Sequence, residues 1–206
     1  MIINSANHPL SMSQRIAKRL FDIIFSLLLL LTLLPLLILI WILLSVFMRE
    51  NGFFFQQRVG RGGQLFNIIK FKTMKNISGY ESTITSLDDI RITKIGYFFR
   101  QTKIDELPQL WNVLIGQMSF VGPRPDVPDY ADKLSGSDRM ILLVRPGITG
   151  PAQIFYSNEG EILSKQKNIK KYNDSVIWPN KVRINLKYVN NQTFWGDVRY
   201  IWRTIV

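Results

Sequence analysis

The chain of 206 residues has the length of one globular domain plus an anchor, and its composition, 47% apolar and 12% aromatic, supports a folded core. Its formal net charge of +11 indicates an anionic partner: nucleic acid, an anionic membrane face or a phosphorylated substrate. With no cysteine, the sequence excludes disulfides, thiolate nucleophiles and Cys/His zinc sites. A histidine base would have to be His8, in the N-terminal tail, so catalysis is expected to use carboxylates, lysine, tyrosine or hydroxyls, and a metal would bind through oxygen.

The N-terminal region divides into a short polar tail and a long apolar segment. Residues 1–14 predict a flexible tail, and 15–49 predict a membrane segment, because no residue from Ile23 to Met48 is charged. A cleaved signal peptide is the competing interpretation, but this apolar run is about twice the usual ~7–15 residues and lacks a small-residue cleavage site.

Pro35 lies near the middle of the apolar segment and predicts a break between two half-helices, each shorter than the hydrocarbon core is thick. Thr32 is a candidate to bond backbone groups that the proline frees. Basic residues flank both ends of the segment, namely Arg15, Lys18 and Arg19 before it and Arg49, Arg58 and Arg61 after it. The positive-inside rule then favours a re-entrant helix with both ends in the cytoplasm, and a kinked single span is the alternative.

Two strands joined by a glycine-rich turn are predicted next, within a globular region at 50–206. Phe53–Val59 and Gln64–Lys72 are rich in aromatic and β-branched residues, and the run Gly60-Arg61-Gly62-Gly63 between them is typical of a hairpin turn. The glycines could instead cradle a phosphate, but such loops lead into a helix, whereas a strand-like run follows here. Residues 76–90 are polar without an apolar period and predict a loop.

A helix and two stiff loops follow. One buried helical face ending near Gly116 is predicted from apolar residues at spacings of three and four, namely Ile104, Leu107, Leu110, Trp111 and Leu114. Thr102 or Asp105 could cap this helix. Proline and glycine cluster at 122–125 and 145–147, and a helical stretch is expected between them at Tyr130–Val144.

The C-terminal region mixes aromatic and basic residues, namely Phe194, Trp195, Tyr200 and Trp202 with Arg199 and Arg203. This pattern predicts a helix. A position at the membrane interface and packing against the core are equally consistent with it.

Asp105 and Glu106 are adjacent carboxylates at the start of the predicted helix. Four cations precede them closely and would hold a carboxylate ionised and nucleophilic: Arg91, Lys94, Arg100 and Lys103. One carboxylate could attack while the other binds a divalent cation. Acidic residues are also favoured in the first turn of any helix, so a purely structural role stays open at this point.

Arg124 and Arg145 each lie beside prolines that stiffen the backbone, which suits a guanidinium directed at a phosphate. Surface arginines in stiff loops are common, so the signal is not specific. Spacing gives no reason to select Lys70, Lys72 or Asp197.

Several long motifs, in order, resemble the bacterial sugar transferase family, the small monotopic polyprenyl-phosphate phosphoglycosyl transferases. The motifs are KRLFD (18–22), the proline-broken apolar segment, QQRVGRGGQLFNIIKFKTM (56–74), RITKIGYFFRQTKIDELPQLWNVLIGQMSFVGPRP (91–125) and RPGITGPAQI (145–154). The similarity covers nearly the whole chain from residue 15 onward.

The resemblance implies that Asp105 attacks the β-phosphorus of a nucleotide diphosphosugar and releases the nucleoside monophosphate. Glu106 would complete the dyad and help to hold Mg²⁺. The phosphosugar would then pass from the aspartyl intermediate to undecaprenyl phosphate. Four further residues fall where the family keeps functional, substrate-binding or phosphate-binding residues: Lys70, Arg124, Arg145 and Asp197.

Two features depart from the family pattern. Where many members have Ser-Pro at the helix break, this chain has Leu34-Pro35. The stretch after RPGITG is often similar to WQVNGR, whereas residues 151–159 here are PAQIFYSNE. Because of the second departure, the resemblance does not imply which sugar this chain uses.

The expected fold is α/β, with a re-entrant helix-break-helix anchor, interfacial helices and a small globular catalytic domain. By resemblance, the protein works at the cytoplasmic face of the bacterial inner membrane, uses a nucleotide diphosphosugar and a polyprenyl phosphate, and opens assembly of a surface glycan such as O-antigen, capsule or exopolysaccharide. No nucleic-acid partner is expected, and a homodimer is one option for the assembly. The alternative is a membrane-anchored basic binding protein without catalysis.

Overall fold

The computed structural model describes residues 10–77, 85 and 89–206. A long helix, α1 (Met12–Met48), begins at a capping box in which the Ser11 hydroxyl accepts from the Gln14 amide. Within the predicted tail, residues 1–9 lie outside the described residues, whereas Met12–Gln14 belong to α1. At 37 residues, α1 is roughly 56 Å long.

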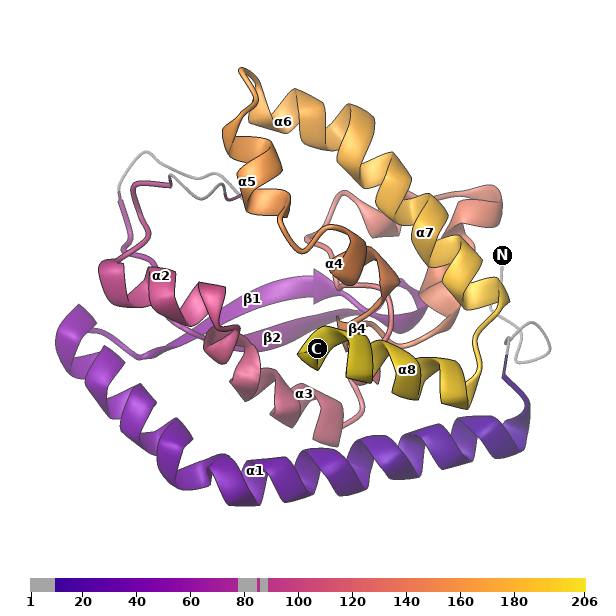
Figure 1. The fold of residues 1–206 in the computed structure, drawn as a ribbon, viewed down its shortest axis with the longest axis horizontal. Coiled ribbons are helices and arrows are strands. Elements are labelled where there is room, and N and C mark those ends of the chain that lie inside the picture. The colour runs from indigo at the N-terminus through magenta and orange to yellow at the C-terminus, as the bar shows by residue number, and fades with distance from the viewer. Residues whose placement is uncertain (1–9, 78–84, 86–88) are drawn as a thin grey trace.

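The helix continues through Pro35, so the expected break into two separate halves is wrong for this structure. Figure 1 instead shows a single indigo helix that bends partway along. A proline removes one intrahelical hydrogen bond and can be absorbed as a bend. The Thr32 hydroxyl donates to the carbonyls of Leu28 and Leu29, which precede the carbonyl that Pro35 cannot bond.

The predicted hairpin is confirmed. β1 (Phe53–Val59) pairs antiparallel with β2 (Leu65–Phe71), with Phe53 opposite Phe71. The turn is a short 3₁₀ segment, Arg61–Gly63, in which Gly62 has φ 73° and Gly63 has φ 83°. These positive angles explain the glycines, and the strand that follows rules out the phosphate-cradling loop that leads into a helix.

The dyad region contains α2 (Lys94–Gln101), a 3₁₀ segment (Ile104–Gln109) and α3 (Leu110–Leu114). The expectation of one α-helix with a single buried face, ending near Gly116, is wrong. Ile104–Gln109 forms a 3₁₀ segment, and Trp111, expected on the buried face, is 50% exposed. Neither Thr102 nor Asp105 caps it. The residue before the segment is Lys103, at φ 58°, and it provides no side-chain cap.

A second, smaller sheet joins β3 (Ser119–Val121) to β4 (Gly147–Thr149) in parallel. The expected helix at Tyr130–Val144 is present only as two 3₁₀ segments, Ala131–Lys133 and Gly136–Leu143. Of the expected loop at 76–90, residues 78–84 and 86–88 lie outside the described residues.

The C-terminal part of the chain is helical. Its elements are α4 (Pro151–Phe155), α5 (Glu159–Ser164), α6 (Ile169–Tyr172), a π-helical turn (Asn173–Ile177), α7 (Trp178–Asn190) and α8 (Phe194–Ile205). The predicted C-terminal helix is confirmed. Tyr200 and Ile201 pack against the core, while Trp195 and Trp202 are 77% and 66% exposed, so α8 has both a core face and an exposed aromatic face.

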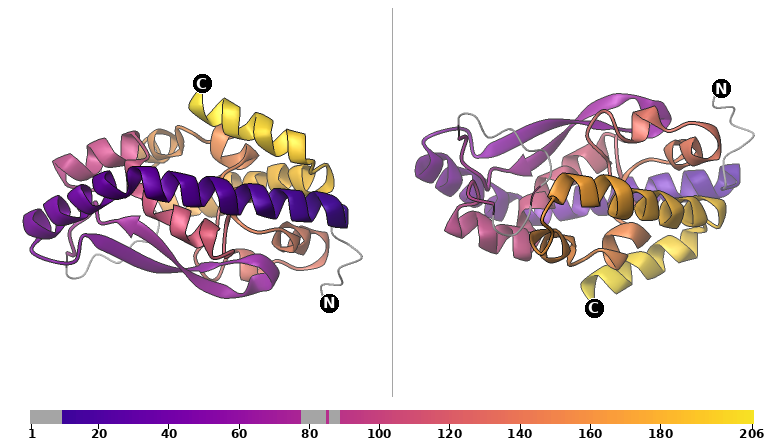
Figure 2. Two further views of the ribbon diagram at one scale, coloured as in Figure 1. Left: turned by 90° about the horizontal axis from the view of Figure 1, so that it is seen from below. Right: turned by 90° about the horizontal axis from the view of Figure 1, so that it is seen from above.

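The two parts of α1 contact the domain through different chemistry. Near its start, Lys18 donates to Asp197 of α8 at 2.6 Å, and buried Asp22 accepts from Ser119 of β3 at 3.1 Å. Beyond Pro35, the contact with the sheet is apolar, because Leu37, Ile40 and Leu44 form one core cluster with Phe71 of β2. Figures 1 and 2 show that α1 runs along one side of the whole domain, so the molecule is a mixed helix and sheet fold with a long apolar N-terminal helix.

Candidate active site

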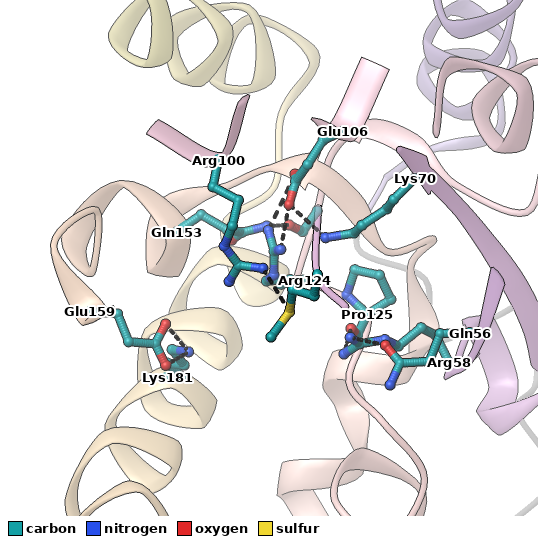
Figure 3. Close-up of polar contacts among 12 residues, drawn as sticks. Gln56, Arg58, Lys70, Arg100, Glu106, Arg124, Pro125, Gln153, Glu159 and Lys181 are labelled. Carbon is teal, nitrogen blue, oxygen red and sulfur yellow. Dashed lines mark hydrogen bonds and ion pairs between the residues drawn. The ribbon is translucent and has the colours of Figure 1, made fainter. Parts of the chain in front are cut away.

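Glu106 is the centre of a buried charged cluster. Its Oε1 accepts from Lys70 Nζ at 2.8 Å and from Arg124 Nη2 at 2.5 Å, as Figure 3 shows. Burial favours the neutral acid, but Arg124 and Lys70 outweigh it and hold the pKa of Glu106 well below its usual range. Glu106 is therefore an ionised carboxylate that fixes two cations.

Asp105, next to Glu106 in the 3₁₀ segment, is in a different state. Its side chain is buried, and among the described residues its Oδ1 has no hydrogen-bond partner. Burial raises the pKa of Asp105, and the charge of Lys70 only partly offsets this. Cations were expected to hold this carboxylate ionised, but the net direction of the pKa shift is upward, because burial outweighs the cations and the charge of Glu106 adds to its effect. An unpartnered buried oxygen is free to react or to bind.

Lys70 reaches the cluster because of its position in β2. Side chains alternate along a strand, so Ile69 and Phe71 face the other way, with Phe71 packed on α1. Burial lowers the pKa of Lys70 to about 8, against the attraction of Glu106. A lysine held in this way supplies positive charge beside the dyad.

Arg124 is positioned by the stiff loop that follows β3. The Gly122 amide donates to Thr149 at 3.0 Å, and the Gly147 amide donates to Pro123 at 2.8 Å. A Cβ at Gly122 would lie 2.3 Å from the carbonyl oxygen of Arg145, so only glycine allows this close approach. The backbone thus holds Arg124 rigidly, with its side chain still 39% exposed. A partly exposed guanidinium can hold Glu106 and still contact an incoming anion.

Of the four cations that precede the dyad in sequence, Arg100 in α2 acts on Asp105 through its charge. Arg91 instead pairs with Asp89 at 2.7 Å. The Arg100 guanidinium contacts the Met74 sulfur at 3.5 Å, and Figure 3 shows it on the Arg124 side of the cluster. Sequence reasoning did not single out Arg100 within that group.

Sequence reasoning also missed Arg58 of β1 and Asp126. Arg58 donates to the carbonyl of Pro125 at 3.2 Å, and burial lowers its pKa to about 10. Burial raises the pKa of Asp126 to about 7, although Lys181 and Arg58 oppose this. The sequence offered one signal for Arg58. It lies two residues after Gln56 in a predicted strand, which places both side chains on the same face of the hairpin.

Two predicted site residues make their contacts elsewhere. The Arg145 Nε donates to the Gly116 carbonyl at 2.8 Å, and Asp197 binds Lys18, Tyr188 and Gln192. Lys72, which sequence spacing did not select, pairs with Glu50. The structure therefore joins Lys70 and Arg124 to the dyad but gives Arg145 and Asp197 other partners.

Magnesium is the metal implied by the family resemblance. No set of three or more acidic or histidine side chains that could hold a metal is gathered among the described residues. Mg²⁺ that is used with phosphate substrates needs only one or two carboxylates, because phosphates and water supply the other ligands. The unpartnered Oδ1 of Asp105 and the Oε2 of Glu106, which is 3.4 Å from Arg124, fit that requirement.

The cluster combines a reactive carboxylate with cations that can accept phosphate charge. Asp105 lies beside three such cations, Lys70, Arg100 and Arg124. A carboxylate attacks an anionic diphosphate only when nearby positive charge screens their repulsion. The arrangement therefore suits nucleophilic attack on a phosphorus atom.

Comparison with known proteins agrees with this chemistry. Residues 13–206 match the bacterial sugar transferase family. The undecaprenyl-phosphate galactose phosphotransferase of Salmonella typhimurium is 33% identical over 99% of this chain and 43% of its own length. The UDP-glucose:undecaprenyl-phosphate glucose-1-phosphate transferase of Klebsiella pneumoniae is 34% identical over 96% of this chain and 41% of its own length. An uncharacterized sugar transferase of Bacillus subtilis is 33% identical over 92% of this chain and 86% of its own length.

The chain thus spans less than half the length of the first two relatives and most of the third. The matched part contains α1, the hairpin and the dyad cluster.

Proposed function

Because the chain belongs to the bacterial sugar transferase family, we propose that it moves a sugar-1-phosphate from a nucleotide diphosphosugar, a UDP-sugar, to undecaprenyl phosphate. The single observation that carries this proposal is the buried dyad, in which Glu106 fixes two cations while Asp105 keeps an unpartnered oxygen. The reaction would be the first membrane step in assembly of a surface glycan. A basic binding protein without catalysis has no use for such a dyad.

In the first half-reaction, an Asp105 carboxylate oxygen forms a bond to the β-phosphorus of the donor. The bond between this phosphorus and the oxygen bridging to the α-phosphorus breaks, and the nucleoside monophosphate leaves with the bonding electrons. Lys70 and Arg124 lie beside the dyad and can accept the charge that develops on the phosphate oxygens. Glu106 acts by holding both cations in place.

Asp105 and Glu106 would together hold Mg²⁺ with the donor phosphates. The ion would neutralise negative charge on the diphosphate, which is the chemistry that magnesium supplies to phosphoryl transfer. The raised pKa of Asp105 fits this role, because a divalent cation or a bound donor would replace the partner that the carboxylate lacks.

In the second half-reaction, a phosphate oxygen of undecaprenyl phosphate attacks the phosphorus of the aspartyl phosphosugar and releases Asp105. An apolar cavity of about 320 Å³, which neither dyad residue lines, supports binding of the prenyl chain. It lies between α1 and the hairpin and is lined by Ile69, next to Lys70, and by Pro108, two residues after Glu106. An isoprenoid chain lying there would bury its apolar surface against α1 and the hairpin.

The anchor that we propose is re-entrant, with the catalytic domain at the cytoplasmic face of the inner membrane. By length and composition, α1 is the one described helix apolar enough to cross a membrane. Both its ends contact the same domain, through Lys18 near the start and Leu44 near the end. A straight span would place these ends on opposite sides of the bilayer, so the shared contacts favour entry and return on one side.

The activity test uses purified full-length chain with undecaprenyl phosphate, Mg²⁺ and a panel of UDP-sugars, and measures UMP release. We expect release that needs both the metal and one or a few of the donors. Asp129→Asn is the matched control for Asp105→Asn, because Asp129 is an exposed aspartate whose φ of 76° asparagine also tolerates. No release with any donor, from protein shown to be folded, would contradict the proposed activity.

The topology test uses single cysteines, since the chain has none. Ser13→Cys lies at the start of α1, and Asn76→Cys lies after the hairpin, both at exposed positions. In intact cells, we expect an impermeant maleimide to label neither cysteine, and to label both after the membrane is opened. Labelling of Ser13→Cys alone in intact cells would indicate a spanning helix and refute the re-entrant anchor.

A further inference from the structure

A cavity of about 260 Å³ lies where the first turns of α1 meet the hairpin turn and the residues before β4. Five cations line it: Arg15, Lys18, Arg19, Arg61 and Arg145. The other lining residues are apolar apart from Gln192, so no carboxylate is found among the described residues that line the cavity. This second cationic site shares no residue with the dyad cluster.

Backbone carbonyls fix three of these cations without neutralising them. Arg19 donates to the carbonyls of Val113 at 2.7 Å and Leu114 at 2.8 Å. Arg61 donates through Nε to the Leu143 carbonyl at 3.0 Å, and Arg145 uses its own Nε in the same way. The two terminal nitrogens of Arg61 and of Arg145 make no hydrogen bond within the part of the chain that the structure describes. These nitrogens are therefore available to donate to a ligand.

The arginines also repel one another. Burial lowers the pKa of Arg61, and the charge of Arg15 lowers it further. Burial likewise lowers the pKa of Arg145, with Arg19 as the next cause. Asp197 pairs with Lys18, and Asp22 partly offsets the effect on Arg145, but the arginines still face one another. Gathering these like charges costs stability, and a bound anion would lower that cost.

An apolar stripe leads away from the cavity along α1. Met12, Ile16 and Leu20 line the cavity and are 68%, 51% and 53% exposed. Their spacing of four residues places them on one side of the helix, and Ile24, 59% exposed, continues the row toward the apolar segment. A ligand suited to both features has an anionic head and an apolar tail.

We propose that this cavity binds the phosphate group of an anionic bilayer phospholipid, whose acyl chains lie along the stripe Met12, Ile16, Leu20 and Ile24. Arginine guanidinium groups bind phosphate oxygens through paired, charge-assisted hydrogen bonds. The bilayer is the source of the ligand because no dyad residue lines the cavity, so an acceptor phosphate bound here would not face Asp105. The proposal rests on the membrane placement of α1 proposed above.

Native mass spectrometry of the full chain, released from detergent micelles, tests this site. The probes are dioleoyl phosphatidylglycerol and phosphatidylcholine with the same acyl chains. Wild-type protein should retain one phosphatidylglycerol and no phosphatidylcholine. The double variant Arg15→Gln/Arg61→Gln should weaken the Kd for phosphatidylglycerol about tenfold or more, which corresponds to about 1.4 kcal/mol.

A second double variant controls for net charge. Lys133→Gln/Lys165→Gln removes the same charge from side chains that are 67% and 70% exposed, and it should leave phosphatidylglycerol binding unchanged. Equal weakening in both double variants would show attraction by charge alone and overturn the site. Should the Arg15/Arg61 double variant fail to fold, Arg15→Gln alone suffices, because the Arg15 side chain has no hydrogen bond within the described chain, and an unchanged Kd would contradict the proposal.

Two further arms identify the source of the phosphate. The same protein is also incubated with undecaprenyl phosphate and with inorganic phosphate. If binding of either one requires Arg15 and Arg61, while binding of phosphatidylglycerol does not require them, the bilayer assignment is overturned. Asp105→Asn should retain phosphatidylglycerol even when UMP release is lost. The lipid-binding proposal can therefore fail while the proposed activity holds, and the reverse.

Discussion

Two buried carboxylates, Glu106 and Asp197, are held against cations in different ways. Asp197 is closed in: it accepts from Lys18 at 2.6 Å, from Tyr188 at 2.7 Å and from Gln192 at 3.3 Å. Glu106 binds Lys70 and a partly exposed Arg124, and its neighbour Asp105 keeps an unpartnered oxygen. The first centre has no spare capacity for a ligand, whereas the second has.

On the proposed mechanism, the difference separates a structural ion pair from a catalytic one. The Asp197 centre ties α8 to α1, and Lys18 also donates to the carbonyl of Val121 in β3 at 3.2 Å. The Glu106 centre joins β2 to the loop after β3 and leaves positive charge facing outward at Arg124. Burial and a cation alone therefore do not distinguish the two centres, whereas the exposure of Arg124 and the unpartnered oxygen of Asp105 do.

The largest effect is expected from Asp105→Asn, which should lower turnover by about 10⁴-fold or more, as loss of a nucleophile does. Thermal stability should change little, because asparagine has the same shape and Asp105 makes no ion pair within the described residues. UMP release and thermal denaturation measure the two properties. Asp129→Asn should affect neither.

Glu106→Gln should come next, with turnover lower by roughly 10²–10³-fold, typical for loss of preorganised charge stabilisation. Unlike Asp105→Asn, it should also lower thermal stability, because Lys70 and Arg124 lose their buried partner. Steady-state rates and melting curves of the same preparations give both values. Wild-type stability together with wild-type turnover would contradict the role assigned to Glu106.

Asp197→Asn tests whether the Asp197 ion pair is structural. Removing one partner of a buried pair leaves Lys18 uncompensated and should lower the free energy of unfolding by roughly 3–5 kcal/mol. Activity per folded molecule should fall far less than for Asp105→Asn. A turnover loss as deep as that of Asp105→Asn, in protein of wild-type stability, would mean that Asp197 belongs to the reactive centre.

The smallest expected effect concerns pH. Burial raises the pKa of Asp126 to about 7, against about 3.9 in an unfolded chain. A carboxyl with a raised folded pKa contributes stability that is complete below about pH 4 and is lost as the pH rises to about 7. Relative to wild type, Asp126→Asn should gain a few degrees in Tm between pH 4 and 7.5. An equal change for Asp129→Asn, or none for Asp126→Asn, would refute this assignment.

The local pattern of the chain was enough to predict the hairpin. Runs rich in aromatic and β-branched residues on both sides of Gly60–Gly63 predict both strands and their turn, because these are short-range constraints. The apolar run likewise predicted a long helix, but not that it continues through Pro35. A bend absorbs the lost hydrogen bond, and its extent depends on the tertiary contacts of Leu37 and Ile40.

The proposed catalytic centre was only partly predictable. Asp105 and Glu106 stand out as a pair, and family resemblance pointed to Lys70 and Arg124. The unequal states of the two carboxylates could not be predicted, because they depend on which of them the distant cations reach in the folded chain. For the same reason, the sequence could not show that Asp197, expected by resemblance to bind substrate or phosphate, has partners from α1 and α7.

The most direct test of the account is a single-turnover experiment without acceptor. Wild-type protein is mixed with Mg²⁺ and a UDP-sugar radiolabelled in the sugar, chosen from the donor panel, and both UMP and protein-bound label are counted. Close to one UMP and one acid-stable label per active protein are predicted, with the label mapped to Asp105 and discharged by undecaprenyl phosphate. UMP release that requires the acceptor, with no label on Asp105, would contradict the covalent mechanism.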